Sequence, residues 1–366
     1  ELLIGEGITI STPSREVGGV AKPLISIILT TYNSEFTIRL VLESIINQDF
    51  PLDRTEFIIV DGGSRDSTAK IVREFLEMYN SSFARVEFVA HDKNYGVSKA
   101  RNDGIKLSRG EYVLILDHDV ILARETLKTL YSYLENSPRK VLCAVPLHLN
   151  VAGGKLQKIY EEIHRGKVVK RLSNITSCAL CRRVDLIEHV GLYDETLGPP
   201  YTIYEDVELG ERALAKGYEI HLIGWHAVTH DAREPPQNPH IVSNMAKRGR
   251  LIAVLKSLLD PRYRYALKKM LRSAPLPDKI RWRLYQLFLI LFTASIPGVI
   301  VLPQLPLATL VLFTILWLDA VRQYWNPRKI RLALIYATSA LGWRIARSVM
   351  LFLPPPTLKK SLASAG

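Results

Sequence analysis

The segment YVLILDHDV, residues 112–120, ends an apolar run on two aspartates that are separated by one residue. A short apolar run of this kind is typical of a strand that is covered on both faces. Carboxylates two residues apart at a strand end can place one oxygen on a divalent metal ion and another on a ribose. Hard oxygen ligands suit Mg²⁺ or Mn²⁺. Asp117 and Asp119 are therefore the first candidate site residues.

Strand and helix patterns alternate on both sides of this segment. Short apolar strands separated by helices of ten to fifteen residues predict an α/β fold with a doubly wound, mostly parallel sheet. Strands are expected at residues 25–30, 56–60, 86–90 and 112–116, and helices at residues 36–47, 67–79, 97–107 and 123–136.

The ligand of such a sheet lies beyond the carboxyl ends of its strands. Three of the predicted strands end on polar residues: Thr31-Tyr32-Asn33, Asp61-Gly62 and Asp117-His118-Asp119. Neither GxGxxG nor GxxxxGKS occurs in the sequence, which excludes a Rossmann or P-loop phosphate site. A nucleotide bound here would need a different means of holding its phosphates, such as a metal ion on the two aspartates.

Six segments, in order, resemble the family 2 glycosyltransferases of the GT-A fold over residues 24–235. They are SIILTTYN (26–33), IIVDGGSRDST (58–68), NYGVSKARNDGI (94–105), YVLILDHDV (112–120), SCALCRRVDLIEHVGLYDE (177–195) and YEDVELGERALAKGYEI (204–220). The resemblance implies transfer of a sugar from a nucleotide-diphospho-sugar with inversion at the anomeric carbon. It also implies roles for individual residues.

On the donor side, the resemblance implies that Thr31, Tyr32 and Asn33 line the nucleotide pocket and that Asp61 hydrogen-bonds the base. The remaining expected donor contacts are Lys99 and Arg101 at the base or diphosphate, Asp117 at the ribose and His118 between the two aspartates. Asp119 is expected to hold Mg²⁺ or Mn²⁺, with His230 as a second metal or phosphate contact.

On the acceptor side, one carboxylate of Glu205-Asp206 is expected to act as the catalytic base, and Asp206 is favoured. Transfer to a hydroxyl requires a base that removes the proton as the bond forms. The alternative is that both are first-turn acids that favour the dipole of the following helix. The QxxRW motif of processive synthases is absent, and Arg248 or Arg250 is expected near the diphosphate or acceptor.

The carboxylate pair favours a hydroxyl acceptor on a membrane glycolipid or lipid-linked sugar, because a polyprenyl phosphate is already ionised and needs little base catalysis. A polyprenyl-phosphate glycosyltransferase is the close alternative, and a non-catalytic nucleotide-binding membrane scaffold is the alternative from another class. The base of the donor is open between uridine and guanosine, with GDP-mannose favoured by analogy.

Charge is divided unevenly along the chain. Residues 1–243 contain 28 Lys and Arg against 33 Asp and Glu, whereas residues 244–366 contain 20 against 3. Such an asymmetry indicates a polyanionic partner. Because the basic residues alternate with aliphatic runs, an anionic membrane surface is expected and nucleic acid is not.

No charged residue occurs from position 284 to 318. This length predicts a transmembrane helical hairpin at 284–325, with both ends in the cytoplasm by the positive-inside rule; a buried soluble hairpin or a re-entrant pair are the alternatives. The expected segments are an N-terminal extension (1–22), a catalytic domain (23–235), a linker with basic interfacial helices (236–283), the hairpin, and an amphipathic helix with a tail (326–366). The expected location is the cytoplasmic face of the cell membrane.

Three cysteines in 366 residues exclude a disulfide scaffold and suit a reducing cytoplasm. No signal peptide is visible at the polar N-terminus. Cys178 and Cys181 have CxxC spacing, but no second pair accompanies them, so neither zinc nor redox chemistry is expected.

Overall fold

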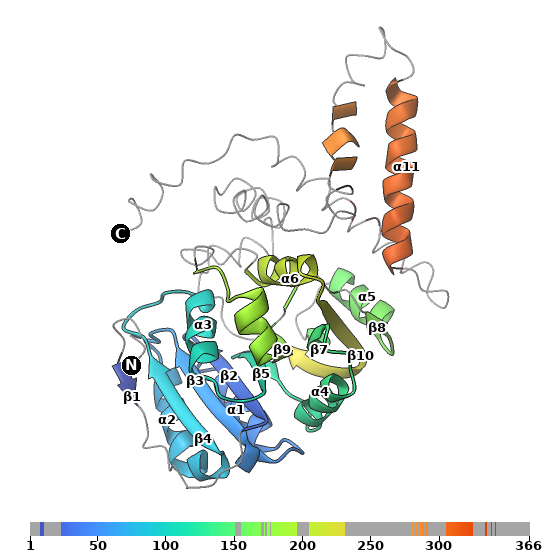
Figure 1. Cartoon of the computed structure of the whole chain (residues 1–366). Coiled ribbons are helices and arrows are strands. Elements are labelled where there is room, and N and C mark those ends of the chain that lie inside the picture. The colour runs from blue at the N-terminus through green and yellow to red at the C-terminus, as the bar shows by residue number, and fades with distance from the viewer. Residues whose placement is uncertain are drawn as a thin grey trace. The chain divides into compact units, whose positions relative to one another are not determined.

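The computed structural model describes residues 8–10, 23–150, 155–169, 172, 174–175, 177–195, 205–230, 280, 283–284, 286–288, 290–291, 305–324, 334, 338 and 341 (Figure 1). The chain divides into two compact units. The first contains residues 1–153 and 164–243, and the second contains residues 154–163 and 244–366.

Strands of the first unit form one sheet of ten strands in the order β1-β4-β3-β2-β5-β9-β7-β10-β6, with β8 beside β10. The strands are β1 (Ile8–Ile10), β2 (Ile25–Thr31), β3 (Thr55–Asp61), β4 (Arg85–Ala90), β5 (Tyr112–Asp117), β6 (Val120–Ile121), β7 (Val141–Asn150), β8 (Val168–Val169), β9 (Cys178–Arg182) and β10 (Glu219–His230). Strands β4, β3, β2 and β5 are parallel, as are β7 and β10. Strand β9 runs antiparallel between β5 and β7. The predicted α/β fold is confirmed, but the sheet is mixed, because the pairs β1–β4, β5–β9, β7–β9, β10–β6 and β10–β8 are antiparallel.

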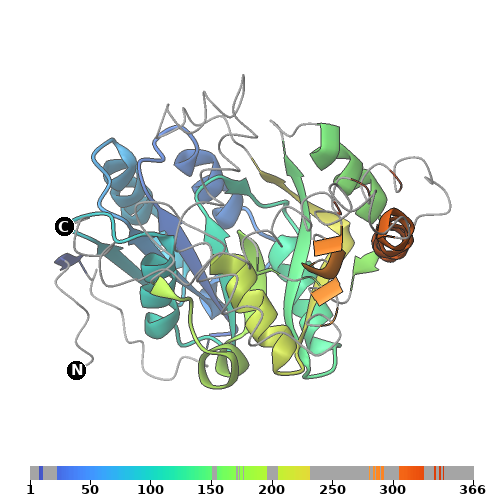
Figure 2. The ribbon, with the colours of Figure 1, turned by 90° about the horizontal axis from the view of Figure 1, so that it is seen from above.

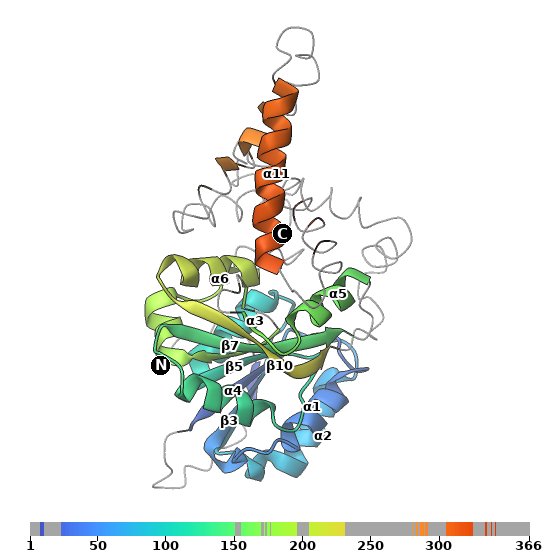
Figure 3. The ribbon, with the colours of Figure 1, turned by 90° about the vertical axis from the view of Figure 1, so that its right-hand side faces the viewer.

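Helices cover both faces of the sheet. They are α1 (Ile38–Ile46), α2 (Thr68–Tyr79), α3 (Val97–Leu107), α4 (Thr126–Glu135) and α6 (Glu205–Ala215) in the first unit, with 3₁₀ turns at Leu52–Arg54 and Asn80–Ser82 and a π-helix at Asp185–Val190. Figure 3 shows α3 and α6 on one side of the sheet and α1, α2 and α4 on the other. Figure 2 shows the same separation of α3 from α1 and α2.

Alternate residues of each central strand account for these two layers. On β3, Phe57 and Ile59 join the large core under α1, α2 and α4, whereas Ile58 and Val60 face Ala100 of α3. A strand exposes successive side chains to opposite faces, so a continuous apolar run needs a cover on both. At Gly104 a Cβ atom would lie 2.3 Å from Cγ2 of Ile28, so the absence of a side chain lets α3 approach β2 closely.

The predicted elements of the first half agree with the structure to within a few residues. The helix at Val97–Leu107 has the predicted bounds, and the strands at β2, β3, β4 and β5 each extend the predicted range by one or two residues. The helices α1 and α4 begin later than predicted, because Thr37 and Glu125 stand at their N-caps. Periodicity therefore identified this half of the sheet element by element.

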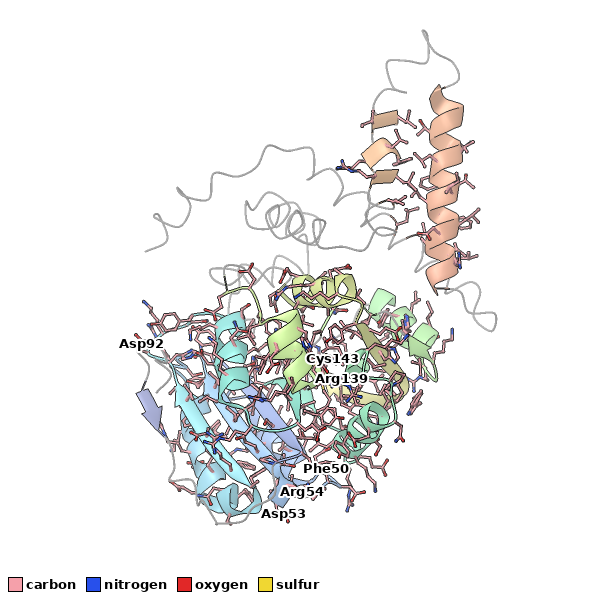
Figure 4. The ribbon with its side chains drawn as sticks, viewed as in Figure 1. Phe50, Asp53, Arg54, Asp92, Arg139 and Cys143 are labelled. Atoms are coloured by element: carbon pink, nitrogen blue, oxygen red, sulfur yellow. A yellow bond between two sulfur atoms is a disulfide. The ribbon has the colours of Figure 1, made fainter. Side chains whose placement is uncertain are left out.

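A disulfide joins Cys143 of β7 to Cys181 of β9, which was not predicted from the sequence and departs from the expectation of a reducing cytoplasm. Figure 4 labels Cys143 within the sheet. The two residues are directly opposite each other in the antiparallel β7–β9 pair, which brings their side chains together. The two bridged cysteines are 38 residues apart in the sequence, and the disulfide does not join the CxxC pair of Cys178 and Cys181. Cys178 is buried and carries the third, unbridged thiol.

Two helices are described in the second unit, α5 (Lys155–His164) and α11 (Leu305–Tyr324). Leu312, Leu316 and Ala320 of α11 pack with Phe288 and Leu341. Leu310, Val311, Ile315 and Leu318 of the same helix are exposed. In the described part of the chain, no helix is long and apolar enough to span a membrane, so the predicted transmembrane hairpin is not supported.

Most of the predicted basic appendage lies outside the described residues. This applies to nearly all of the predicted linker at 236–283, with the candidate site residues Arg248 and Arg250, to most of residues 284–304 and to nearly all of residues 326–366.

Candidate active site

The carboxyl ends of β2, β3 and β5 meet at one edge of the sheet. Thr31 pairs with Asp61 of β3, and Thr30 pairs with Asp117 of β5. The chain passes from β2 to β3 and β4 on one side and then returns to β5 on the other, so this edge is the topological switch point. Figure 4 marks the opposite edge, where the strands begin, by Asp53 and Arg54, and places Asp92 beyond the end of β4.

Asp61 is 2% exposed and is fully engaged in the turn that follows β3. Its carboxylate accepts hydrogen bonds from the hydroxyl of Thr31 (2.8 Å), from the amide of Ser64 (2.9 Å) and from the hydroxyl of Ser64. These contacts fix the shape of the loop that a base would enter. Contact between Asp61 and a nucleobase stays a prediction.

Asn33 connects the loops after β2 and β3. Its backbone has a φ of 48°, in the left-handed region that asparagine tolerates better than most residues. The Asn33 amide donates to Ser64 Oγ (2.8 Å), and its Oδ1 accepts from the amide of Arg65 (2.8 Å). Tyr32, between Thr31 and Asn33, is half-buried. The first predicted pocket segment is thus held against the second.

Arg101 of α3 lies at the centre of the site and is only 4% exposed. Its Nη2 donates to both carboxylate oxygens of Asp117 (2.9 and 2.8 Å), and its Nη1 donates to Glu205 Oε1 at the start of α6 (3.0 Å). The guanidinium also lies over the ring of Tyr193 at 5.2 Å. One buried cation therefore ties the donor-side strand to the acceptor-side helix.

The charged groups of this network shift the pKa values of one another. Burial would lower the pKa of Arg101, but the carboxylates of Asp117 and Glu205, with Tyr193, raise that pKa above its ordinary value. Burial raises the pKa of Glu205 in spite of the opposing effect of Arg101, and the neighbouring Asp206 raises it further. Arg101 stays charged, and its guanidinium binds both carboxylates. The predicted contact of Arg101 with the base or diphosphate stays a prediction.

Asn102, the next residue on α3, fixes the segment before α6. Its Nδ2 donates to the carbonyl of Tyr193 (2.9 Å) and to Glu195 Oε1 (2.8 Å), and its Oδ1 accepts from the amide of Tyr193 (2.9 Å). A buried amide with both ends satisfied is a strong positional constraint.

Lys99 lies on another face of α3 from Arg101. Its ammonium contacts both oxygens of Asp103 at 2.5 Å, one helical turn away, and Asp103 Oδ2 lies 3.0 Å from Nε2 of His91. Burial would raise the pKa of Asp103, but His91 and Lys99 lower it. The predicted role of Lys99 at the base or diphosphate stays a prediction.

Asp119 and His230 are adjacent, as the metal hypothesis requires. Asp119 Oδ2 lies 3.1 Å from His230 Nε2, and β10 pairs with β6 at the register His230–Val120. Burial would raise the pKa of Asp119, but the hydrogen bond from His230 and the nearby imidazoles lower it. That same hydrogen bond raises the pKa of His230.

His148 on β7 was missed by the sequence reasoning. Its ring centroid lies 6.1 Å from that of His230, and its Nδ1 lies 3.4 Å from the hydroxyl of Ser177. Burial and the neighbouring His230 lower the pKa of His148 to about 4, so the ring is neutral at pH 7. No local motif marks His148; only the parallel pairing of β7 with β10 brings it to the site.

Asp206 has a more open environment than Glu205. Asp206 is half-buried, whereas Glu205 is buried. Its Oδ2 accepts from Nδ2 of Asn174 at 3.3 Å, and its carbonyl accepts from the amide of Ile175 at 3.2 Å. Both acids belong to the first turn of α6, where negative charge is favoured by the helix dipole. The dipole interpretation and a catalytic one are compatible in this geometry.

The structure thus brings Arg101, Asp117 and Glu205 into one network, and Asp119 and His230 into a second. Arg101 and Asp117 came from the quoted motifs, but their pairing with each other did not. Asn102 and Tyr193 were missed as site residues, although both lie inside quoted segments, next to Arg101 and just before the segment that leads to α6.

Residues 26–188 match the family model described as Glycosyl transferase family 2. Poly(ribitol-phosphate) beta-N-acetylglucosaminyltransferase TarS of Staphylococcus aureus is 35% identical over 117 residues, which are 32% of this chain and 20% of TarS. Glycosyltransferase AglE of Haloferax volcanii is 27% identical over 202 residues, 54% of this chain and 64% of AglE. The chain therefore covers less than two thirds of either relative.

Solved structures show the same fold. The complex of S. aureus TarS with UDP-GlcNAc has a TM-score of 0.53 and 20% identity, with 90% of each chain covered. The UDP complex of the same protein has a TM-score of 0.53 and 19% identity, also with 90% of each chain covered. These structures show that the chain has a GT-A-like fold, and its similarity to the family 2 glycosyltransferase model extends over residues 26–188.

Proposed function

We propose that the protein transfers a sugar from a nucleotide-diphospho-sugar to a hydroxyl group, with inversion, and that Asp206 is the catalytic base. The observation that carries this proposal is the division within the Glu205-Asp206 pair. Glu205 is buried and bound to Arg101, whereas Asp206, one residue on, is half-buried with a long 3.3 Å contact to Asn174. A base must reach the hydroxyl proton, and the carboxylate that is not held by Arg101 is the one able to do so.

In this proposal the networks around the two strand ends position the reactants. Arg101 holds Asp117 at the end of β5 for contact with the ribose, and the same guanidinium fixes the start of α6 relative to that strand. A single displacement needs no enzyme nucleophile, so the chain has to orient two substrates and accept one proton. Arg101 then acts as a positioning residue, because both of its charged partners are protein carboxylates.

Asp119 and His230 fit a divalent metal ion as an incomplete ligand set. The described residues contain no group of three or more His, Cys, Asp or Glu side chains placed to hold a metal. Mg²⁺ or Mn²⁺ on a diphosphate commonly takes only one or two protein ligands, with the substrate oxygens and water completing the shell. When bound, the ion neutralises charge on the departing diphosphate. Asp119 Oδ2 and His230 Nε2 are the atoms proposed to hold it.

The first donors to test are UDP-GlcNAc and GDP-mannose. TarS, which matches this chain in sequence and in fold, has been solved with UDP-GlcNAc, and this supports a uridine donor. GDP-mannose is the second choice, by analogy with lipid-directed members of the family.

A membrane glycolipid or a lipid-linked sugar at the cytoplasmic face of the cell membrane is the proposed acceptor. The support is the excess of basic residues after position 243 and the exposed apolar side chains of α11, among them Leu310, Ile315 and Leu318. An exposed apolar patch together with an excess of basic residues suits an anionic membrane surface.

The experiment is transfer by the purified full chain, with each donor, with Mn²⁺, Mg²⁺ or EDTA, and with and without a total lipid extract. The proposal expects metal-dependent release of one nucleotide that rises with lipid and falls by about 10²–10⁴-fold in Asp206→Asn. Asp53→Asn, at the opposite edge of the sheet, is the matched control and keeps activity.

Two results would redirect the assignment. If transfer survives Asp206→Asn, the acceptor is already ionised and the polyprenyl-phosphate reaction replaces the hydroxyl reaction. If a donor binds but neither donor turns over, the protein is a nucleotide-binding scaffold.

A further inference from the structure

Strand β10 contains a three-residue bulge, Gly224-Trp225-His226. Ile223 pairs with Pro146 of β7 and Ala227 pairs with Leu147, so the three residues between them have no counterpart in β7. Proline has no N–H to donate to a ladder, which favours interruption of the pairing at Pro146. Such bulges redirect a side chain away from the regular alternation of a strand.

The residue before Trp225 is fixed by backbone contacts. The Gly224 amide donates to the carbonyl of Lys167 (2.6 Å), and its carbonyl accepts from the amide of Gly166 (2.8 Å). A Cβ atom at Gly224 would lie 1.9 Å from the carbonyl oxygen of His164, so only glycine fits this close approach. The bulge is therefore pinned on its N-terminal side.

The residue after Trp225 and the indole itself are also fixed. Nε2 of His226 lies 2.9 Å from Oγ1 of Thr126 at the start of α4. The Trp225 ring packs edge-to-face on Tyr133 of α4, with centroids 5.9 Å apart and an interplanar angle of 63°. Tyr133 is held in turn by its hydroxyl, 2.7 Å from Nδ1 of His221. The indole is thus constrained by its surroundings although it is 54% exposed.

A surface depression of about 590 Å³ lies beside this indole. Its wall is one side of α4 and the turn after it, and it offers hydroxyl, amide, carboxylate and ammonium groups. The lining residues are Glu125, Lys128, Thr129, Ser132, Tyr133, Asn136, Ser137 and Trp225. A fixed aromatic face next to a few polar groups is the composition of a small-ligand site.

We propose that this depression binds a neutral saccharide, with one face of a pyranose ring on the Trp225 indole. A pyranose has an apolar C–H face and a polar rim of hydroxyls, which match an aromatic plane bordered by donors and acceptors. Glu125 and Lys128 are the charged residues of the lining, and their opposite charges leave no net charge that would favour an anionic or a cationic ligand. The polar rim is a poor match for an acyl chain.

This site is separate from the candidate active site. None of its lining residues takes part in the Arg101 network or in the Asp119–His230 pair, and a bound glycan here would add an anchor outside the reaction centre. The proposal concerns binding alone, so it does not require the proposed transfer reaction to be correct.

The test is ¹⁹F NMR of the full chain labelled with 5-fluorotryptophan. The chain has five tryptophans, and the resonance that disappears in Trp225→Phe is that of Trp225. Chitotetraose and mannotetraose are titrated separately into the millimolar range. The proposal expects a saturable shift of the Trp225 resonance with at least one of them, and no saturable shift of the other four.

Three variants locate the binding. Ser132→Arg keeps the indole but fills the depression, and it should weaken binding at least tenfold. Met78→Ala, which removes another exposed apolar side chain on α2, should leave the titration unchanged. Asp206→Asn should also leave it unchanged, because the active site is not involved.

The proposal is overturned if neither saccharide moves the Trp225 resonance, or if the shift persists unchanged in Ser132→Arg. It is also overturned if phosphatidylglycerol vesicles, and not saccharides, move the resonance, which would indicate a membrane contact. A shift that follows protein concentration alone would indicate a surface for a second copy of this chain.

Discussion

The two sides of the candidate site are built in different ways. At the ends of β2 and β3, polar side chains from adjacent strands bind one another, as Thr31 does with Asp61. On the side of α6 the contacts join distant segments, since Glu205 meets Arg101 across 104 residues of sequence. The first side depends on strand register and the second on a single buried cation. Substitution of Arg101 should therefore disturb the side of α6 more than the ends of β2 and β3.

A similar difference is found within the two carboxylate pairs, Asp117 with Asp119 and Glu205 with Asp206. Asp117 and Glu205 are each the first member of a pair, and both are bound to Arg101. Asp119 and Asp206 follow them and contact His230 and Asn174 instead. One member of each pair is thus held by Arg101, and the other is the one to which the proposed function assigns a metal ion or a proton.

The largest expected effect on stability comes from removal of the shared cation. Arg101→Met leaves the half-buried Asp117 and the buried Glu205 without their partner, which should lower the free energy of unfolding by about 3–5 kcal/mol. The midpoint of thermal unfolding measures the loss. Arg54→Met, at an exposed position where the strands begin, is the control and should change stability by no more than about 0.5 kcal/mol. Equal melting of Arg101→Met and the parent protein would show that the network adds no stability.

Reduction of the disulfide between β7 and β9 should have the next largest effect on stability. Reduction of Cys143–Cys181, which closes a loop of 38 residues, should cost up to about 4 kcal/mol on the chain-entropy account. Dithiothreitol should therefore lower the melting midpoint of the parent protein. The double variant Cys143→Ala/Cys181→Ala should melt at one temperature with or without reductant. A reductant effect that persists in this variant would assign the effect to another cause.

A smaller effect should appear in the pH dependence of stability. Because the pKa of Glu205 is raised in the folded chain, the folded chain binds more protons than the unfolded chain from the ordinary glutamate value upward. The free energy of unfolding should therefore fall as the pH rises from the ordinary pKa of glutamate to the raised pKa of Glu205. Glu205→Gln can still accept from Arg101, and it should remove this part of the pH dependence. Denaturant unfolding at a series of pH values would measure the free energy of unfolding of the parent protein and of Glu205→Gln. The same dependence of this free energy on pH in both proteins would contradict the prediction.

Periodicity and strand-end chemistry predicted the first half of the fold well, because each short strand there is a continuous apolar run. Strand β9 was not predicted, since its antiparallel place between β5 and β7 depends on tertiary pairing. The sequence placed Asp119 and His230 at one site, and they are adjacent.

The partners of Arg101 could not be predicted from the residues alone. A buried arginine is specified by the carboxylates that surround it, and Glu205 comes from a helix far along the chain. The same limit applies to His148 and to the Cys143–Cys181 bridge, each of which depends on which strand lies beside β7. Local patterns predict elements and strand-end residues, whereas contacts between distant segments require the fold.

The central claim is that Asp206 removes the proton of the acceptor hydroxyl, whereas Glu205 has a positioning role through its bond to Arg101. The most direct measurement is kcat for nucleotide release with lipid acceptor in Asp206→Asn and Glu205→Gln, alongside donor binding by each. We expect Asp206→Asn to lose about 10²–10⁴-fold in kcat with donor binding retained. Glu205→Gln should lose less than about tenfold, or 1.4 kcal/mol of barrier. The reverse order, with Glu205→Gln inactive and Asp206→Asn active, would contradict the account.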